Sequence, residues 1–139
     1  MEKKISRSEE ETFRIAKEYA SQVEAGDVIC LEGNLGAGKT HFTKGFVTVF
    51  GVDQAAVTSP TFALINEYHG KEIEIYHFDC YRLENVQEAL EIGAEEYLYG
   101  DGICIIEWPE RIEEILPSHS KRVTITATGP EEREISFNP

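Results

Sequence analysis

The stretch of sequence that decides the fold is Gly33-Asn34-Leu35-Gly36-Ala37-Gly38-Lys39-Thr40. It matches the pattern G-x-x-x-x-G-K-[S/T] at every position, which is typical of a phosphate-binding loop between a strand and a helix. Glycines allow the backbone to come close to phosphate oxygens, which its N–H groups can then bind. The start of the following helix adds partial positive charge at the same place. The stretch therefore predicts a site for the phosphates of a nucleotide.

The sequence on both sides of this loop has the pattern that such a loop requires. Before it, residues 28–31 form a short apolar run, which is typical of a buried strand in a parallel sheet. After it, Phe42, Phe46 and Phe50 recur every four residues and predict a helix that ends at Gly51. A strand, a glycine loop and a helix in this order favour a P-loop NTPase fold.

The remaining segments predict an α/β fold in which a mixed β-sheet is flanked by helices. Ser8 begins a capping box and opens a helix with Ile15, Tyr19 and Val23 on one side and a stop at Gly26. Further elements are expected as strands over residues 62–68, 72–78, 103–106, 122–127 and 133–137, and as a helix with a possible break at Gly93 over residues 86–98. We expect one P-loop ATPase domain over residues 1–139.

Length and composition limit the class of protein. The 139 residues suit one domain, and the 41% hydrophobic and 28% charged residues are ordinary for a globular protein. No apolar run approaches the roughly 20 residues of a membrane span, and no apolar stretch follows the lysines near the start. We therefore expect a cytoplasmic protein without a membrane segment. The cysteines are widely spaced, which favours core thiols at Cys30, Cys80 and Cys104.

The chain is strongly acidic, with 26 acidic and 13 basic residues and a net charge of −13. Such a surface repels a phosphate backbone, so we expect little direct binding of nucleic acid. The charge could steer the chain to a basic protein partner, and plain solubility is the simpler explanation.

A P-loop enzyme also needs side chains that hold Mg²⁺ and orient water. Lys39 is expected to bridge the β- and γ-phosphates, and the hydroxyl of Thr40 to bind Mg²⁺. Glu107 follows the apolar run 103–106, and Asp79 follows the strand-like residues 75–78. Both would end strands at the sheet edge where ligands bind in α/β folds. A solvated surface position is the alternative for either carboxylate.

Two further segments have a functional and a structural interpretation. Residues 58–61, Thr-Ser-Pro-Thr, could sense the γ-phosphate through Mg²⁺ or form an ordinary turn. Trp108 precedes a proline, which favours an extended backbone beside Glu107. The tryptophan could pack the site, meet a partner or belong to the core.

Together these motifs resemble those of the TsaE family, formerly called YjeE, the bacterial ATPases of tRNA threonylcarbamoyladenosine biosynthesis. The motifs occur in the family's order as Gly33-Asn34-Leu35-Gly36-Ala37-Gly38-Lys39-Thr40, Ser59-Pro60-Thr61-Phe62, His77-Phe78-Asp79-Cys80-Tyr81-Arg82-Leu83 and Ile106-Glu107-Trp108-Pro109. The resemblance implies an ATP and Mg²⁺ site. It also implies partners similar to TsaD and TsaB, the complex that transfers the threonylcarbamoyl group to tRNA.

The resemblance also implies roles for individual residues. Thr40 and Glu107 would hold Mg²⁺, and Asp79 and Trp108 would matter for activity together with Lys39. Binding of the nucleotide would involve Thr12, Gly33, Asn34, Leu35, Gly36, Ala37, Gly38, Lys39, Thr40, His41 and Arg133. His41 departs from the second hydroxyl residue that is more common in the family, so its backbone N–H is the group expected to contact phosphate.

Two other functions remain open from the sequence. A small-molecule kinase also uses a P-loop, but it needs an acceptor pocket and usually a lid with arginines, for which only Arg82 and Arg111 are mid-chain candidates. The chain could also be a non-catalytic module whose interactions depend on nucleotide. A GTPase is disfavoured because the sequence contains no N-K-x-D motif for guanine.

Overall fold

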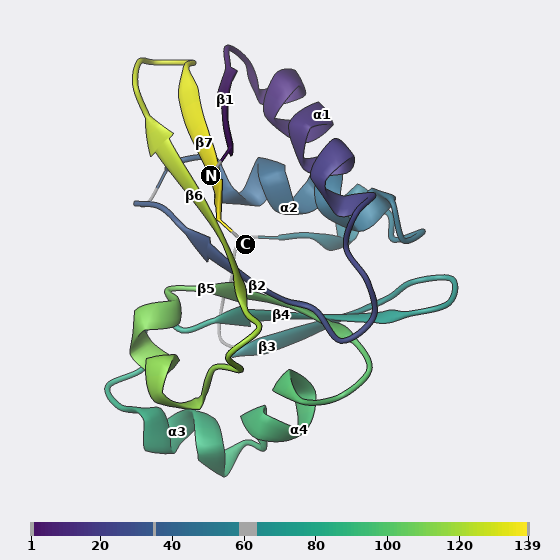
Figure 1. Ribbon diagram of the computed structural model, residues 1–139, viewed down its shortest axis with the longest axis vertical. Coiled ribbons are helices and arrows are strands. Elements are labelled where there is room, and N and C mark those ends of the chain that lie inside the picture. The colour runs from purple at the N-terminus through teal and green to yellow at the C-terminus, as the bar shows by residue number, and fades with distance from the viewer. Residues whose placement is uncertain (1, 35, 59–63, 139) are drawn as a thin grey trace.

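A mixed sheet of seven strands forms the centre of the protein (Figure 1). The computed structural model describes residues 2–34, 36–58 and 64–138. The strands lie in the order β1-β7-β6-β2-β5-β4-β3. Strands β6, β2, β5 and β4 are parallel, whereas β7, β1 and β3 add antiparallel pairings at the two sides. The predicted P-loop NTPase fold with a mixed sheet is confirmed.

The strands are β1 (Glu2–Ser6), β2 (Val28–Glu32), β3 (Ile65–His69), β4 (Glu74–Asp79), β5 (Ile103–Glu107), β6 (Lys121–Ala127) and β7 (Arg133–Asn138). The α-helices are α1 (Glu9–Ala20), α2 (Lys39–Thr48), α3 (Val86–Glu91) and α4 (Ala94–Leu98), and two 3₁₀ helices are η1 (Gln54–Ala56) and η2 (Pro109–Ile115). Within the described residues, no helix has the length and apolarity needed to cross a membrane.

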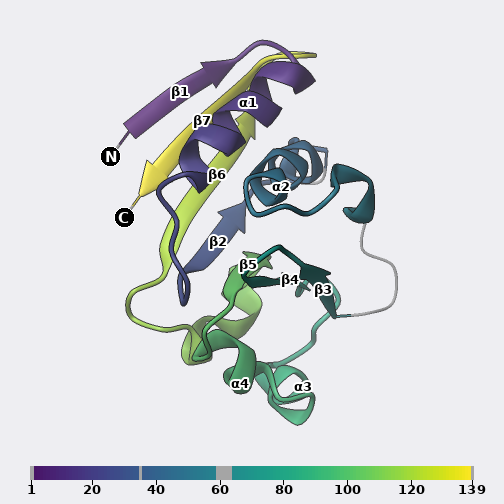
Figure 2. The same ribbon diagram turned by 90° about the vertical axis from the view of Figure 1, so that its right-hand side faces the viewer.

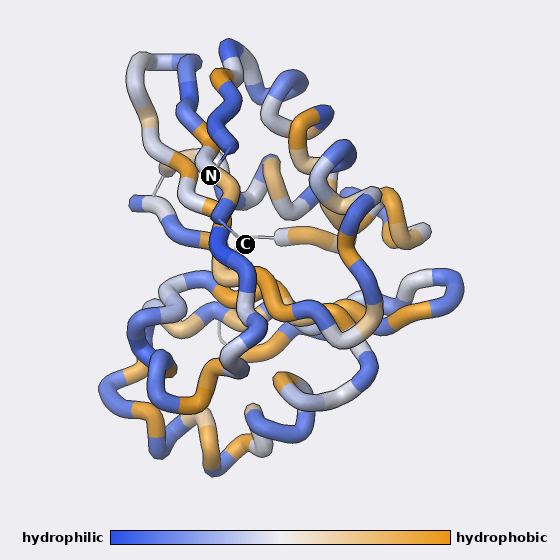
Figure 3. Tube along the Cα trace, viewed as in Figure 1, coloured by the Kyte–Doolittle hydropathy of each residue, from blue (hydrophilic) through white to orange (hydrophobic). Residues whose placement is uncertain are grey.

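Helices cover both faces of the sheet, so the central strands are buried on both sides. Helices α1 and α2 pack on one face, and α3, α4 and η2 lie on the other (Figure 2). Apolar segments gather at the central strands, and polar stretches follow the outer parts of the helices and loops (Figure 3). In α2, Phe42 and Phe46 are almost fully buried. Burial of one such side chain stabilises a fold by about 1.5–3 kcal/mol.

Helix α1 begins as predicted but ends earlier. The Ser8 hydroxyl accepts a hydrogen bond from the Glu11 N–H at 3.0 Å, while the Glu11 carboxylate accepts one from the Arg7 N–H. The helix ends at Ala20 rather than near Gly26. Gly26 instead has a φ of +89° and forms the turn into β2, donating its N–H to the Gly102 carbonyl. A positive φ suits glycine in a turn as well as it suits a helix stop.

The other predicted elements are present with small shifts in their bounds. The predicted hairpins correspond to β3–β4 and β6–β7, and Gly93, with a φ of +81°, separates α3 from α4. The sequence analysis missed β1, η1 and η2. Strand β1 is an exposed edge strand with three charged residues, so it lacks the apolar alternation that marks a half-buried strand. Of residues 58–61, predicted either to sense the γ-phosphate or to form an ordinary turn, residues 59–61 lie outside the described residues.

Candidate functional site

The sheet brings the two predicted carboxylates together beside the glycine loop. Strand β5 lies between β2, which leads into the loop, and β4. The register pairs Leu31 of β2 with Glu107 of β5, and Glu107 with Asp79 of β4. Because these strands are parallel, their carboxyl ends meet at one edge of the sheet, where ligands of α/β proteins bind.

The loop has backbone conformations that only glycine adopts readily. Gly36 and Gly38 have φ angles of +80° and +104°. A Cβ atom at Gly33 would lie 2.8 Å from the carbonyl oxygen of Ile125, so this position has no room for a side chain. Gly38 is also the N-cap of α2 and has no side chain that could bind the first N–H groups of the helix. These donors are therefore left for solvent or an anionic ligand.

Lys39, the first residue of α2, is held between a carboxylate and an aromatic ring. The lysine is 6% exposed, and its Nζ lies 3.6 Å from Oε1 of Glu107 and 4.4 Å from the ring centroid of Trp108. An ammonium group over an indole ring gains a cation–π attraction. These two contacts hold the lysine side chain inside the cleft in front of the glycine loop.

Trp108 has a strained backbone that aims its side chain at this lysine. The extended backbone predicted from the following proline is wrong: the φ of 58° and ψ of 52° lie in the left-handed region, a rare conformation for a bulky residue. Such a conformation costs about 1–3 kcal/mol, and strained residues of this kind cluster at functional sites. Pro109 follows and begins η2. The ring of Tyr81 lies 4.9 Å from the Trp108 ring, so the indole is packed between Tyr81 and Lys39.

Glu107 has a second partner that the sequence analysis did not identify. Its Oε2 lies 2.5 Å from Nε2 of His77, and Nδ1 of His77 lies 2.9 Å from the hydroxyl of Tyr68. Burial opposes ionisation of Glu107, but the hydrogen bond from His77 and the charges of His77 and Lys39 outweigh it. The pKa of Glu107 therefore lies below its ordinary range, and the carboxylate is ionised at neutral pH.

A cavity of about 1000 Å³ lies in front of the loop and contains most of the predicted site residues. Its walls come from the start of α1, the loop, the ends of β4 and β5, and the β6–β7 turn. The predicted residues that line it are Thr12, Gly36, Gly38, Lys39, Thr40, His41, Asp79, Glu107, Trp108 and Arg133. The volume matches that of typical pockets for small ligands.

Three predicted loop residues face a different space. Gly33, Asn34 and Ala37 line a smaller cavity of about 390 Å³, and Trp108 borders both cavities. Leu35 lies outside the described residues.

Arg133 of β7 holds the loop through its backbone. Its Nε donates to the carbonyl oxygen of Ala37 at 2.9 Å, and its Nη2 donates to that of Gly36 at 3.4 Å. The same guanidinium donates to the carbonyl oxygens of Gly129 and Glu132. The arginine therefore joins the β6–β7 turn to the loop and fixes the direction of the two loop carbonyls.

Thr12 and His41, two other predicted site residues, contact side chains close to them. The hydroxyl of Thr12 is buried and lies 2.7 Å from that of Ser6. His41 places Nε2 3.1 Å from a carboxylate oxygen of Glu9. Both side chains line the cavity where the start of α1 approaches α2.

The oxygen groups in the cavity are of the kind that Mg²⁺ prefers. Thr40 provides a hydroxyl and Glu107 an ionised carboxylate. Mg²⁺ is usually held by one or two side chains together with phosphate oxygens. Among residues 2–34, 36–58 and 64–138, no group of three or more His, Cys, Asp and Glu side chains is placed to hold a metal alone. The donor set thus fits a metal that arrives with a nucleotide.

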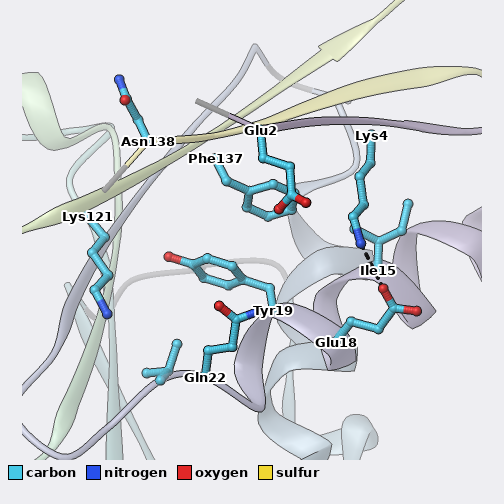
Figure 4. Close-up of a pocket in the computed structure, with 10 residues that line it drawn as sticks. Glu2, Lys4, Ile15, Glu18, Tyr19, Gln22, Lys121, Phe137 and Asn138 are labelled. Carbon is cyan, nitrogen blue, oxygen red and sulfur yellow. Dashed lines mark hydrogen bonds and ion pairs between the residues drawn. The ribbon is translucent and has the colours of Figure 1, made fainter.

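Another cavity, of about 540 Å³, lies at the opposite end of the sheet (Figure 4). Tyr19 stacks on Phe137 there at 4.9 Å, and Lys4 pairs with Glu18 at 2.8 Å. Asn138 lines this cavity and pairs with Arg122 at the start of β6, whereas the glycine loop follows the end of β2. None of the predicted site residues lines it.

Comparison with known proteins gives one consistent family. The family model described as "Threonylcarbamoyl adenosine biosynthesis protein TsaE" matches residues 6–135. The chain is 47% identical over 128 residues to the tRNA threonylcarbamoyladenosine biosynthesis protein TsaE of Bacillus subtilis, covering 92% of this chain and 79% of that protein. It is 40% identical over 132 residues to the protein of the same name from Treponema pallidum, covering 95% and 96%.

A solved structure shares the fold. The crystal structure of YdiB from Bacillus subtilis superimposes with a TM-score of 0.80 and 41% sequence identity. The match covers 98% of this chain and 83% of that chain.

Proposed function

This chain belongs to the TsaE family, and from that premise we propose that it binds and hydrolyses ATP to drive a complex that makes threonylcarbamoyladenosine in tRNA. The curated relatives are named for tRNA threonylcarbamoyladenosine biosynthesis. The observation that carries the ATPase proposal is the position of Lys39. It is a buried lysine at the end of a complete glycine loop, and it faces a cavity that the carboxylates of Asp79 and Glu107 also line.

Nucleotide binding would exchange one partner of Lys39 for another. The lysine now contacts Glu107 and the Trp108 ring. Phosphate oxygens in the cavity would attract its Nζ toward the β- and γ-phosphates, while the N–H groups at the start of α2 bind the same anion. Arg133 would hold the loop in this shape by its bonds to the carbonyls of Gly36 and Ala37.

Each carboxylate has a separate proposed role. Thr40 and Glu107 would hold Mg²⁺, which supplies charge stabilisation to the transferring phosphoryl group. Asp79 ends the next strand and accepts a hydrogen bond from the Tyr81 N–H at 3.1 Å. It would orient the attacking water or pass the state of the nucleotide to a partner.

Partner proteins are proposed to complete the catalytic site. An arginine that stabilises the transition state is worth on the order of 10³-fold or more in related enzymes. Here Arg133 is bound to loop carbonyls, Arg111 donates to the carbonyl oxygen of Leu83 at 2.8 Å, and Arg82 lines the cavity with an interaction of its own. Hydrolysis by the isolated chain should therefore be slow and should rise with proteins similar to TsaD and TsaB. The acidic surface argues against tight binding of tRNA by this chain itself.

A steady-state ATPase assay tests the proposal. The rate is measured for the chain alone and with TsaB-like and TsaD-like proteins, and Lys39→Ala serves as the inactive control. We expect slow turnover alone and a clear rise with the partners. Fast turnover that partners leave unchanged would contradict the coupling. Transfer of phosphate to a small metabolite would favour the kinase alternative.

A further inference from the structure

A chain of buried polar side chains runs across the sheet behind the candidate Mg²⁺ site. It connects Tyr68 of β3, His77 of β4, Glu107 of β5 and Lys39 of α2, with contacts of 2.9, 2.5 and 3.6 Å in turn. These residues are between 2% and 6% exposed. Buried polar side chains are held in direction by the partners that they bond to, because few water molecules can take the place of those partners.

Each ring nitrogen of His77 has its own partner. Nε2 lies 2.5 Å from Oε2 of Glu107, and Nδ1 lies 2.9 Å from the hydroxyl of Tyr68. The hydroxyl of Tyr68 can donate to Nδ1, which leaves Nε2 as the nitrogen that donates to the carboxylate. Tyr68 thus holds the imidazole with Nε2 directed at Glu107.

We infer that His77 is a positioning residue that turns Glu107 so that one carboxylate oxygen is committed to the imidazole and the other faces Lys39 and the cavity. Tyr68 orients His77 through the hydrogen bond between its hydroxyl and Nδ1. This inference rests on the proposed function, because Glu107 matters only if a nucleotide and Mg²⁺ bind in front of it. Carboxylates that bind metals are commonly oriented by such second partners, whose loss costs about 10–100-fold in metal affinity or activity.

The strand register explains why a histidine two residues before Asp79 can reach Glu107. Asp79 is paired with Glu107, and His77 is paired with Ile105. His77 and Glu107 are therefore diagonal neighbours on one face of the sheet, a spacing that long side chains can bridge. The face is the one that packs against α2, and Lys39 begins that helix.

A histidine in a core can also be satisfied without any role at a site, and the same hairpin offers a control. His69 of β3 contacts Glu74 of β4 at 2.5 Å, like His77 and Glu107, but this pair is exposed at the far end of the strands. His69 bonds to Glu74 through Nδ1, whose position a glutamine amide does not reproduce, so His69→Gln breaks a similar pair without reaching the cavity. An effect seen on replacing His77 but not on replacing His69 would then come from the orientation of Glu107 and not from the loss of any His–Glu contact.

The test combines spectroscopy of the ligand-free protein with a Mg²⁺ titration. Nitrogen shifts of the imidazoles, measured by NMR, should show His77 protonated at Nε2 in the nucleotide-free protein. ATP binding is then measured at increasing Mg²⁺ for wild type, His77→Leu, His77→Gln, Tyr68→Phe and His69→Gln. Glutamine can place an amide donor near the position of Nε2, so it keeps the bond to Glu107 that leucine removes.

We expect His77→Leu to raise, by about 10-fold or more, the Mg²⁺ concentration that gives half of the gain in ATP affinity. The variant should also lower kcat for ATP hydrolysis, while its ATP affinity without Mg²⁺ stays within a few-fold of wild type. His77→Gln should recover most of the loss, Tyr68→Phe should show a smaller effect, and His69→Gln none. A His77 protonated only at Nδ1, or a folded His77→Leu with the wild-type Mg²⁺ response, would overturn the inference alone. If wild type binds no ATP, the proposed function fails and the inference falls with it.

Discussion

Replacing Glu107 by glutamine should reveal the buried charge pair at the centre of the site. The side chain keeps its size but loses its charge, while Lys39 stays 6% exposed with its Nζ beside the new amide. Removing one partner of a buried ion pair costs about 3–5 kcal/mol. The separation of 3.6 Å is longer than a good charged hydrogen bond, and the Trp108 ring still attracts the ammonium. We therefore expect a loss of about 3 kcal/mol in the free energy of unfolding.

The loss should depend on pH in a direction that Glu107 dictates. Its pKa in the folded protein lies below the ordinary range, because His77 and Lys39 outweigh the effect of burial. Its stabilisation is thus fully present above the unfolded-state pKa of about 4.3 and disappears as the pH falls through the lower, folded-state pKa. The difference between wild type and Glu107→Gln should be constant near neutral pH and should shrink on acidification below about pH 4.

The substitution that lowers the free energy of unfolding should not weaken ATP binding when Mg²⁺ is absent. Without Mg²⁺, ATP would bind Glu107→Gln as tightly as wild type or up to about 5-fold tighter, because Lys39 no longer has to leave a carboxylate; 5-fold corresponds to about 1 kcal/mol. Added Mg²⁺ should then strengthen ATP binding to wild type but not to the variant. Urea unfolding and calorimetry with and without Mg²⁺ measure both effects.

Glu18→Gln is the matched control for this experiment. Glu18 pairs with Lys4 at 2.8 Å, but the pair is open to solvent, with side chains 58% and 35% exposed, so its loss should destabilise the protein far less than the loss of the Glu107 charge. Equal destabilisation by the two variants would refute the argument from the buried charge. A Glu107→Gln protein that keeps the full Mg²⁺ effect would refute the role of the carboxylate at the metal.

Three other variants or reagents test separate parts of the account. Asp79→Ala should leave ATP affinity within a few-fold of wild type, since it removes no phosphate contact, but it should reduce the hydrolysis rate or the activation of hydrolysis by partners. If ATP binding by this variant no longer depends on Mg²⁺, Asp79 and Glu107 have the opposite roles. Arg133→Met should weaken ATP binding about 10-fold by freeing the carbonyls of Gly36 and Ala37, as calorimetry would show, and unchanged affinity would contradict its bracing of the loop. Burial raises the pKa of the thiols of Cys30, Cys80 and Cys104 to about 12. At pH 8 only about one such thiol in ten thousand is then ionised. A disulfide reagent should therefore react with the folded protein far more slowly than with the unfolded chain.

The sequence allowed prediction of the parts of the fold that local patterns specify. The glycine loop and its flanking strand and helix were clear because glycine, lysine and periodic phenylalanines each have a distinct local requirement. Placing Glu107 beside the loop strand also succeeded, since a fully apolar run such as residues 103–106 belongs in the middle of a parallel sheet. Strand β1 escaped prediction because an edge strand with charged residues depends on its partner β7 rather than on its own pattern.

The contacts within the site could not be predicted in the same way. Arg133 reaches the loop from β7, and Tyr68 reaches His77 from β3, so both depend on the order of strands in the sheet. His77 did carry a weak signal. Residues two apart on a strand share a face, so a histidine two positions before Asp79 was bound to lie on the same face as that carboxylate. The left-handed backbone of Trp108 had no signal in the sequence, since the proline that follows it favours an extended residue.

The most direct test of the central claim is calorimetry of ATP binding in the presence of Mg²⁺, with wild type and Lys39→Ala compared under the same conditions. The account predicts that wild type binds and that the variant binds far more weakly or not at all, since Lys39 is the buried cation of the loop. Equal affinity of the two proteins would contradict the assignment of residues 33–40 as the phosphate-binding site.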